Sequence, residues 1–441
     1  MGGFFETFRN AWKIPDLRKR LLYTLLLLLV FRIGCLIPIP GVSAEALKGI
    51  YGGGSDVFSF LNIISGNAAQ NATIFAMSIS PYINASIIMQ LLTVAIPYLE
   101  RLAKDGGEEG KKKLSQYSRY ATIFLALLQS FFMAFNMRNS YDLKPVWFAI
   151  IMVMASLTAG TAFLMWLGEQ ITEKGIGNGI SLIIFAGIVS NGKMAVTSLY
   201  TTFFGGDSNI VLGILYVLLV VVIFLALIAL VIFVTEAERK IPVQYAKRVV
   251  GRKMYGGQNT NIPIKINSAG VLPIIFAMSI LAFPSTILTL FFSDAVQSGK
   301  YAFLNALVNY GNTWWYPIVN ALLVIGFTFF YSAVYFNPKE ISDNLKDNGG
   351  FIPGIRPGKP TTDFIKSVSN KTTTAGALFL ALITVLPTLL QVVLTAINSD
   401  FQGLQLWFGG TSVLILVGVA LETVKQIESF MLARHYKGFL E

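Results

Sequence analysis

Side chains that perform acid–base or nucleophilic chemistry are scarce in this sequence. Its 441 residues include one histidine, His435, and one cysteine, Cys35. A lone cysteine forms no internal disulfide and no cysteine-based metal site. His435 lies in the C-terminal tail, so zinc hydrolysis, Ser-His-Asp catalysis and histidine proton relays have no candidate centre. We therefore expect no catalysis, no metal and no cofactor.

Charged residues inside apolar segments are the next candidates for chemistry, because intramembrane ionisable groups normally mark ion or proton pathways. Only Arg32 and Glu422 qualify, since Lys193 dilutes the segment at 180–202, together with Gly187, Ser190 and Asn191, and is counted outside. Arg32 lies near the outer end of its segment, where its long side chain can snorkel to the surface, and Glu422 lies near the inner end of its own. With no charge at mid-depth, the sequence favours a passive conduit over a pump or a coupled transporter.

Two isoleucine pairs are spaced four residues apart, Ile79 with Ile83 and Ile180 with Ile184. Each pair shares one face of a helix. In most membrane helices such a face contacts lipid. The alternative is a hydrophobic constriction, which blocks ions by dewetting. Spacing alone leaves both interpretations open.

Two short sequences partly resemble nucleotide-binding motifs, but neither matches its motif. Gly358 and Lys359 resemble the end of a phosphate loop, but Pro353 occupies the position of its first glycine and Pro360 follows the lysine. The GIGNG sequence at 175–179 lacks the third glycine of a dinucleotide motif and follows no strand, so it predicts a flexible turn into a membrane span. Any chemical energy is expected to come from a partner.

The elements that must position these residues are membrane helices. Hydrophobic residues make up 54% of the chain and charged residues 13%, about half the charged share of soluble proteins. The first apolar run is longer than a signal-peptide core and lacks a clean cleavage site, so it predicts a span rather than a removable leader. Apolar length predicts ten spans, at 21–39, 73–96, 120–137, 146–167, 180–202, 210–234, 269–292, 314–335, 374–396 and 407–424.

The placement of lysine and arginine predicts the orientation of these spans. With the N-terminus inside, 28 of the 34 basic residues lie on the inner side and Arg32 lies within a span. Five lie outside, namely Lys48, Arg138, Lys144, Lys193 and Lys300. The excess of positive charge on one side predicts that both termini face the cytoplasm.

Ten spans divide into two halves of five, an N-terminal half at 1–208 and a C-terminal half at 209–441. An odd number of spans per half makes any repeat inverted, and inverted repeats often place paired broken helices at the functional site. The second span of each half carries proline, namely Pro81 in one and Pro273 and Pro284 in the other. The plainer interpretation is that proline is common in membrane helices.

Residues 56–65 form an apolar segment that is too short to cross a bilayer. Ten helical residues span about 15 Å, half of a hydrocarbon core of about 30 Å. A half-depth helix cannot expose bare ends to lipid, so it must lie inside protein or line a cavity. A break at Gly66, Asn67 and Asn71 separates it from the next span. The segment therefore predicts a filled space within the membrane.

Basic residues are concentrated in the cytoplasmic loops between spans 2 and 3, at 236–268 and at 336–373. The last two loops each exceed thirty residues, whereas short connections are normal between packed helices. Long basic loops predict a docking platform for RNA, an acidic protein surface or anionic lipid. The alternative is that they only enforce the topology.

Taken together, these segments resemble the SecY family, the channel subunits of the bacterial protein-conducting translocon. The resemblance covers nearly the whole chain and depends on the order and spacing of its motifs. They are FRIGCLIPIPG (31–41), SISPYINASII (78–88), SQYSRY (115–120), LGEQITEKGIGNGIS (167–181), YAKRVVGRK (245–253), NSAGVLPIIF (267–276), FIPGIRPGKPT (351–361) and FGGTSVLI (408–415). The resemblance implies an all-α polytopic fold, with ten transmembrane helices in two inverted five-helix halves around a central pore and a re-entrant plug helix at 56–65.

The resemblance also implies roles for individual residues. The implied plug includes Asp56, Phe58, Phe60, Ile64 and Ser65, and Asn84 and Phe283 are expected to face each other across a lateral gate. The implied pore ring consists of Ile79, Ile83, Ile180, Ile184, Ile275 and Ile415. The implied contacts for a motor or a ribosome are Lys247, Arg248, Arg252 and Arg356. The chain departs from the family at 65–67, where SGN replaces the more usual SGG, and in a short loop between spans 3 and 4.

The implied function is a passive protein-conducting channel of the bacterial plasma membrane. It would pass unfolded secretory polypeptides across the membrane and release signal sequences and membrane helices sideways into it. The implied partners are SecE- and SecG-like small membrane subunits, a SecA ATPase, the ribosome, signal peptides with translocating chains, and anionic lipids.

Three other functions fit the sequence less well. A secondary transporter would need mid-membrane charges. An intramembrane protease or lipid-modifying enzyme would need a nucleophile–base pair or paired carboxylates. A structural ribosome receptor would leave the segment 56–65 unexplained.

Overall fold

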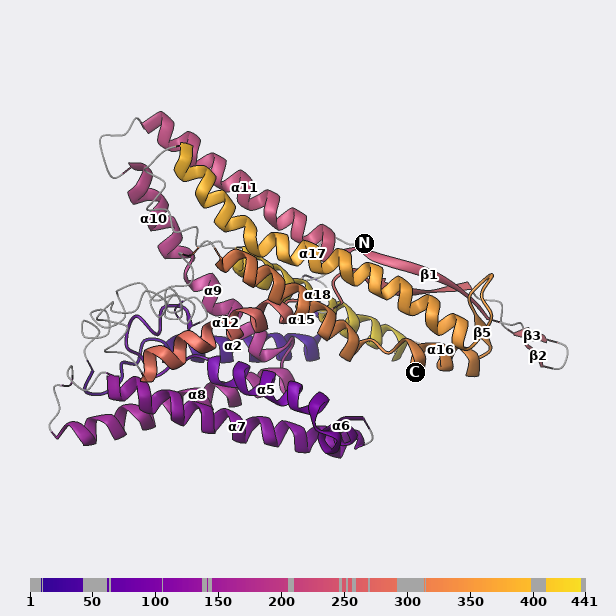
Figure 1. Cartoon of the computed structure of the whole chain (residues 1–441), viewed down its shortest axis with the longest axis horizontal. Coiled ribbons are helices and arrows are strands. Elements are labelled where there is room, and N and C mark those ends of the chain that lie inside the picture. Colours follow the sequence, from indigo (N-terminus) through magenta and orange to yellow (C-terminus); the bar gives the residue numbers. More distant parts are fainter. Residues whose placement is uncertain are drawn as a thin grey trace. The chain divides into compact units, whose positions relative to one another are not determined.

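The computed structural model describes residues 9, 11–42, 62, 65–104, 106–136, 141, 145–204, 210–245, 248–250, 253–255, 259–268, 270–291, 313, 315–397 and 410–437 (Figure 1). Its helices are α2 (Pro15–Gly34), α5 (Ser80–Ala95), α6 (Pro97–Lys104), α7 (Gly107–Asn136), α8 (Val146–Lys174), α9 (Gly179–Ser190), α10 (Gly192–Phe204), α11 (Ile210–Glu236), α12 (Leu272–Phe291), α15 (Tyr316–Tyr335), α16 (Pro338–Asp347), α17 (Lys359–Ile397) and α18 (Gly410–Lys437).

Each predicted span overlaps one of these helices, and the prediction of a helical polytopic membrane fold is confirmed. Within the described residues, five helices are long and apolar enough to cross a membrane, or six if a bent pair counts as one span. The bent pair is α5 and α6, whose axes differ by 104°. The fifth predicted span is split at Asn191 between α9 and α10. The total of ten spans stays a prediction.

Several helices continue beyond the predicted spans into the predicted cytoplasmic loops. α7 begins at Gly107, thirteen residues before position 120, and α17 begins at Lys359, fifteen residues before position 374. At 1.5 Å per residue, each extension adds about 20 Å of helix. Residues expected to form loop therefore form helix, because hydropathy marks where a helix meets lipid and not where its backbone hydrogen bonds end.

The chain divides into two compact units. The first comprises Met1–Thr197, Ser279–Thr313 and Val419–Glu441, and the second comprises Ser198–Met278 and Trp314–Gly418. This division does not follow the predicted boundary between residues 208 and 209, since α10, α12 and α18 each belong partly to both units. The two inverted halves stay a prediction, because a symmetry relation and a division by contacts are different properties.

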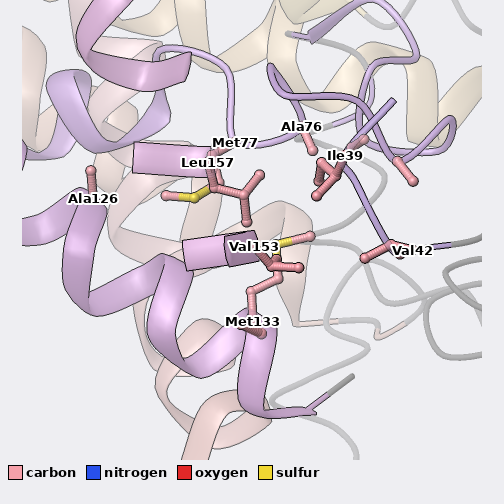
Figure 2. Close-up of a cluster of buried hydrophobic side chains, with 11 residues drawn as sticks. Ile39, Val42, Ala76, Met77, Ala126, Met133, Val153 and Leu157 are labelled. Atoms are coloured by element: carbon pink, nitrogen blue, oxygen red, sulfur yellow. The ribbon is translucent and has the colours of Figure 1, made fainter. Parts of the chain in front are cut away.

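In the first unit, α7 packs along α8, and α5 packs against α7. A buried apolar cluster joins α7 and α8 to the segments that precede α5 (Figure 2). Met133 of α7 and Val153 and Leu157 of α8 meet Met77 and Ile39 there. Leu157 and Val153 are completely buried. The cluster fixes the non-helical chain around positions 39 and 77 to two membrane helices.

In the second unit, α15 and α17 pack side by side. The hydroxyls of Ser332 and Thr373 lie 2.7 Å apart and join the two helices by a hydrogen bond. The ring of Tyr331 lies 4.9 Å from that of Phe276 in α12. Both α12 and α17 therefore pack against α15.

The second unit also contains β-structure in the two long loops, which the expected all-α fold did not include. β1 (Glu238–Tyr245) pairs antiparallel with β4 (Asn259–Lys265) along its length and with β5 (Gly350–Phe351) at its end. A second small sheet joins β2 (Arg248–Val250) to β3 (Lys253–Tyr255). Figure 1 shows these two strands beyond the end of β1.

The sheet has its own apolar core, which it shares with α16 and α17. The core residues are Ile241, Val243, Ile264, Leu345, Ile352 and Ile365. Alternate residues of β1 and β4 supply its strand side, since successive side chains in a strand point to opposite faces. The loops at 236–268 and 336–373 therefore fold together as one body, because β5 and α16 of the second loop pack on the strands of the first.

The GIGNG sequence forms the predicted turn into the fifth span, but its backbone is held by hydrogen bonds. The Ile176 amide donates to Thr24 Oγ1 at 3.0 Å, and the Gly177 amide donates to the side chain of Gln426. Asn178 caps α9 through its side-chain oxygen, which accepts from the amides of Ile180 and Ser181. Side chains of α2 and α18 thus accept hydrogen bonds from the amides of this turn. These bonds hold the turn in one conformation, in contrast to the flexible turn that we expected.

Candidate functional site

A non-helical stretch at 66–79 lies in the first unit between the helical residue Ser65, at the end of the predicted plug, and α5. Residues 65, 68, 69, 72 and 76 are each at most 1% exposed. The ring of Phe75 stacks between those of Phe31 and Phe163, 6.1 Å from each. Irregular backbone at membrane depth is tolerated only where it is buried in protein or lines a cavity. This stretch meets the first condition.

The backbone of this stretch finds its partners within the unit. The Ile39 amide donates to the Ala72 carbonyl at 2.8 Å, and the Ile74 amide donates to the Ile37 carbonyl at 3.1 Å. Ala72 has φ of 52° and Ser78 has φ of 51°, both in the left-handed region that non-glycine residues rarely adopt. The surrounding contacts impose these conformations, since such strained backbone persists only when its surroundings over-determine it.

The C-terminal end of the predicted plug lies at the start of this stretch. Asn62 and Ser65 are helical, and Gly66 has φ of 62°. The Asn67 amide donates to the Asn62 carbonyl at 3.0 Å, the bond that closes a helix whose next residue is left-handed. The predicted plug residue Ser65 is completely buried. The other plug positions, Asp56, Phe58, Phe60 and Ile64, lie outside the described residues.

The predicted pore-ring isoleucines of the first unit lie on two helices. Ile79 precedes α5 and Ile83 lies one turn into it, and they are 1% and 7% exposed. On α9, Ile184 is buried and Ile180 is half-buried. A side chain added at Gly168 of α8 would stand 2.9 Å from Cγ1 of Ile180, so part of Ile180 packs on α8. The prediction that each pair shares one helix face stays a prediction, since Ile79 lies at the N-cap of α5 and only Ile180 of the second pair has a described contact with α8.

The remaining two ring positions lie in the second unit, Ile275 on α12 and Ile415 on α18. Both are buried, at 8% and 5% exposure. Their role in a ring with the isoleucines of α5 and α9 stays a prediction. Burial itself argues against the lipid-facing interpretation for five of the six isoleucines, since a side chain in contact with lipid would be exposed here.

The predicted lateral gate involves α5 and α12. Asn84 lies near the start of α5, in its second turn, and is half-buried. α12 is helical through position 283, although Pro284 lies inside it, and the side chain of Phe283 lies outside what is described. Pro81 and Pro273 lie in the first turns of α5 and α12, where proline is well tolerated because the first amides have no helical partner. Of the prolines in α5 and α12, only Pro284 lies in the interior of its helix.

The predicted docking residues lie in the body formed by the sheet and the start of α17. Arg356 is exposed in the turn between β5 and α17. Its carbonyl accepts a hydrogen bond from Thr361 Oγ1 at 2.8 Å, and Ser342 Oγ donates to the Gly358 carbonyl at 3.0 Å. Arg248 begins β2, and Lys247 and Arg252 lie outside the described residues. A hydrogen-bonded turn on a folded sheet presents Arg356 to the solvent.

The sheet was missed although its sequence carries a signal. Ile241, Val243 and Tyr245 occupy alternate positions, separated by Pro242 and Gln244, and Ile262 and Ile264 flank Pro263; apolar residues at every second position are typical of strands with one buried face. Within the described part of the chain, no three His, Cys, Asp or Glu side chains gather closely enough to hold a metal ion.

Comparisons with known proteins place this arrangement in a family. The family model described as SecY matches residues 73–424. The protein translocase subunit SecY of Halalkalibacterium halodurans is 45% identical over 445 residues, which cover 99% of this chain and 100% of that protein.

Solved structures share the fold. A SecY channel whose plug domain is described as stabilising the closed state matches 93% of this chain and 91% of its own, with a TM-score of 0.58 at 17% identity. Sec61 in the canine ribosome–channel complex matches 93% of this chain and 91% of its own, with a TM-score of 0.55 at 15% identity. From the family match and the full-length relative, we conclude that this chain belongs to the SecY family.

Proposed function

We propose that this chain is the pore-forming subunit of a protein translocase, a passive channel for unfolded secretory polypeptides. The observation that carries the proposal is its 45% identity, over 99% of the chain, to a protein translocase subunit SecY. The channel performs no reaction itself. A partner ATPase of the SecA type or the translating ribosome supplies the energy.

The seal of the closed channel is formed by aliphatic side chains. A translocating polypeptide presents every type of side chain, so the pore wall must not bind any of them strongly. Isoleucines exclude ions by dewetting and offer no hydrogen bonds to hold the chain. The burial of Ile79, Ile83 and Ile184 in the first unit and of Ile275 and Ile415 in the second supports this role.

Signal sequences and membrane helices leave sideways between α5 and α12, past Asn84 and Phe283. A signal sequence is an apolar helix that partitions into lipid, so the gate lining should be nearly neutral. Pro284 removes one backbone hydrogen bond from α12, which lowers the cost of bending that helix. The chain before α5 is buried and non-helical, and the helix begins only at Ser80, inside the predicted span at 73–96. This supports α5 as a gate helix that is distinct from the packed chain before it.

The cytoplasmic body made of β1–β5, α16 and the start of α17 binds the motor or the ribosome through Lys247, Arg248, Arg252 and Arg356. Basic residues on projecting turns suit the phosphates of ribosomal RNA and acidic surfaces of proteins. SecE- and SecG-like subunits cover part of the apolar helix faces, and anionic lipids contact the basic inner side. The channel lies in the bacterial plasma membrane with both termini in the cytoplasm.

Reconstitution tests the function directly. The purified chain with its small subunits is placed in liposomes with a SecA-type ATPase, ATP and an unfolded precursor, and protection of the precursor from added protease is measured. We expect ATP-dependent protection that is lost when the signal sequence is removed. Equal protection without ATP or without the signal sequence would contradict the proposal.

Cross-linking tests the gate. Cysteines placed at Asn84 and Phe283 are expected to form a disulfide under oxidation and to stop export, and reduction is expected to restore it. Each single cysteine variant is the control for damage by the substitution. Normal export with the disulfide formed would remove these positions from the gate.

Charge reversal tests the docking surface. Arg356→Glu is expected to lower ATP-driven export about tenfold or more, because the attraction between Arg356 and an acidic group of the motor becomes a repulsion. Lys366→Glu is the matched control, since Lys366 is an exposed basic residue of α17 and makes the same change in net charge. Equal effects of the two variants would mean that overall charge, not Arg356, governs binding.

A further inference from the structure

Arg32, the basic residue within the predicted first span, lies against the end of the predicted plug helix. Its side chain is half-buried on the last turn of α2. Its Nη1 atom is completely buried and has no hydrogen-bond partner among the described residues. A Cβ atom added at Gly66 would stand 2.7 Å from Nη1. This end of the side chain therefore packs on Gly66.

The contact with Gly66 lies at the C-terminal end of a helix. Ser65 is helical, Gly66 is left-handed, and the Asn67 amide closes back onto the Asn62 carbonyl at 3.0 Å. Gly66 is thus the first residue after the C-terminal end of a helix. A second group of α2 contacts the same end, since Cys35 Sγ donates to the Ser65 carbonyl at 3.7 Å.

A cation at this position stabilises the helix by electrostatics. The last carbonyls of a helix lack partners within it and carry partial negative charge, so positive groups nearby are favourable. The effect is largest in partly buried geometry, where water does not screen it. The guanidinium of Arg32 always carries its charge, and no carboxylate forms a salt bridge with it within the described residues.

We propose that Arg32 is a positioning residue that holds the C-terminal end of the plug helix against α2 and so stabilises the closed channel. The inference rests on the proposed channel function and on the plug at 56–65. α9 forms the other wall, because the same added Cβ at Gly66 would stand 2.4 Å from Ser190 Oγ and 3.1 Å from Cα of Gly187. The helix end is enclosed between α2 and α9, with the only in-span arginine beside it.

The alternative is that Arg32 only fills space at the end of α2. The two roles differ in how they depend on the plug. If Arg32 acts on the plug helix, its charge has no effect on ion leak once that helix is deleted. If Arg32 only supports the packing of α2, its loss damages the channel whether or not the plug is present.

The experiment measures ion conductance of the purified channel in planar bilayers. Arg32→Met removes the charge and keeps the length, and Arg32→Lys keeps the charge. We expect Arg32→Met to raise the resting leak about tenfold, from the electrostatic term at a partly buried helix terminus, and Arg32→Lys to stay within about twofold of the parent. Each substitution is also combined with deletion of residues 56–64.

The combinations separate the possible failures. Deletion alone is expected to raise the leak, and Arg32→Met is expected to add nothing to it, because coupled sites are not additive. If deletion alone leaves the leak unchanged, the proposed plug fails. If deletion raises the leak but Arg32→Met does not, or if Arg32→Met adds fully to the deletion, the inference about Arg32 fails and the plug stands.

A second variant covers the case in which Arg32→Met does not fold. Gly66→Ala pushes a methyl group into Arg32 and Ser190 from the other side, and it is expected to raise the leak as well. Gly107→Ala is the matched control, because Gly107 also has a positive φ, of 55°, but an added Cβ there meets nothing within 4 Å. Equal leak in these two variants would overturn the role of the Arg32 contact.

Discussion

Residues 66–79 and the ribbon of β1 and β4 both leave the helical pattern, but they satisfy their backbones in different ways. In the first stretch, amides donate to carbonyls of the same stretch and of Asn62 and Ile37, the Ile39 amide donates to the Ala72 carbonyl, and most of the residues are buried. In the ribbon, each strand bonds to its neighbour, and one face stays in water. The difference follows from the surroundings, because an unpaired peptide group is costly in an apolar environment and is hydrated in water.

The two regions also differ in the side chains they use. The stretch before α5 is rich in alanine, namely Ala68, Ala69, Ala72 and Ala76, which let helices approach its backbone closely. The ribbon places large aliphatic residues at alternate positions, so that one face is apolar. The non-helical stretch thus depends on small residues and close packing, whereas the ribbon depends on one apolar face. Four substitutions test this comparison, from the largest expected effect to the smallest.

Gly160→Ala tests the close packing of the membrane stretch. A Cβ atom at Gly160 of α8 would stand 2.1 Å from the carbonyl oxygen of Ile74, which is backbone and cannot rotate away. We expect a loss of at least about 3 kcal/mol in the free energy of unfolding, the upper range for overpacking, measured by denaturation in mild detergent. Gly326→Ala in α15 is the control, because nothing lies within 4 Å of its added Cβ. A tolerated Gly160→Ala would mean that this stretch is loosely packed.

Ile241→Ala tests the apolar face of the ribbon. Ile241 is 3% exposed in the core shared with α16 and α17, and truncation of a buried isoleucine costs about 2–5 kcal/mol. We expect this loss to appear locally, as faster hydrogen exchange of the β1 amides with little change in the membrane helices. Gln244→Ala on the exposed face of β1 is the control. Global unfolding by Ile241→Ala would show that the ribbon is not a separate source of stability.

Thr24→Val tests whether a buried turn in the membrane needs a side-chain acceptor. Thr24 Oγ1 accepts from the Ile176 amide at 3.0 Å, and Ile176 is 1% exposed. Loss of the acceptor leaves a buried amide unsatisfied, which costs about 1–3 kcal/mol. Thr24→Ser keeps the hydroxyl and is expected to retain most of the stability in thermal denaturation. Equal stability of the valine and serine variants would indicate that water replaces the hydroxyl.

Asn178→Ala tests the cap of α9, which follows the same turn. The Asn178 side-chain oxygen accepts from the amides of Ile180 and Ser181, at 3.1 and 3.3 Å, in an exposed position. Removal of an N-cap side chain costs about 1 kcal/mol, and Asn178→Asp is expected to preserve it. A shift in melting temperature by alanine no larger than that by aspartate would rule out capping at this turn.

Hydropathy and motif order were sufficient to predict the helical membrane fold and the family. These properties are local, because lipid selects apolar segments one by one and the cytoplasm retains basic loops. The strands of the ribbon also leave a local pattern, because Ile241, Val243 and Tyr245 occupy alternate positions. The length and charge of a loop do not reveal this period, so a prediction from those two properties leaves the strands out.

Only the tertiary structure decided how residues 66–79 and Arg32 are used. No periodicity marks Ala72 and Ser78 as left-handed, because neighbouring helices impose that conformation on residues that do not favour it. The sequence showed one arginine near the end of a span, for which the membrane surface is the usual destination. Contact with Gly66 depends on α2, α9 and a helix end coming together, and such a meeting of distant segments leaves no local pattern.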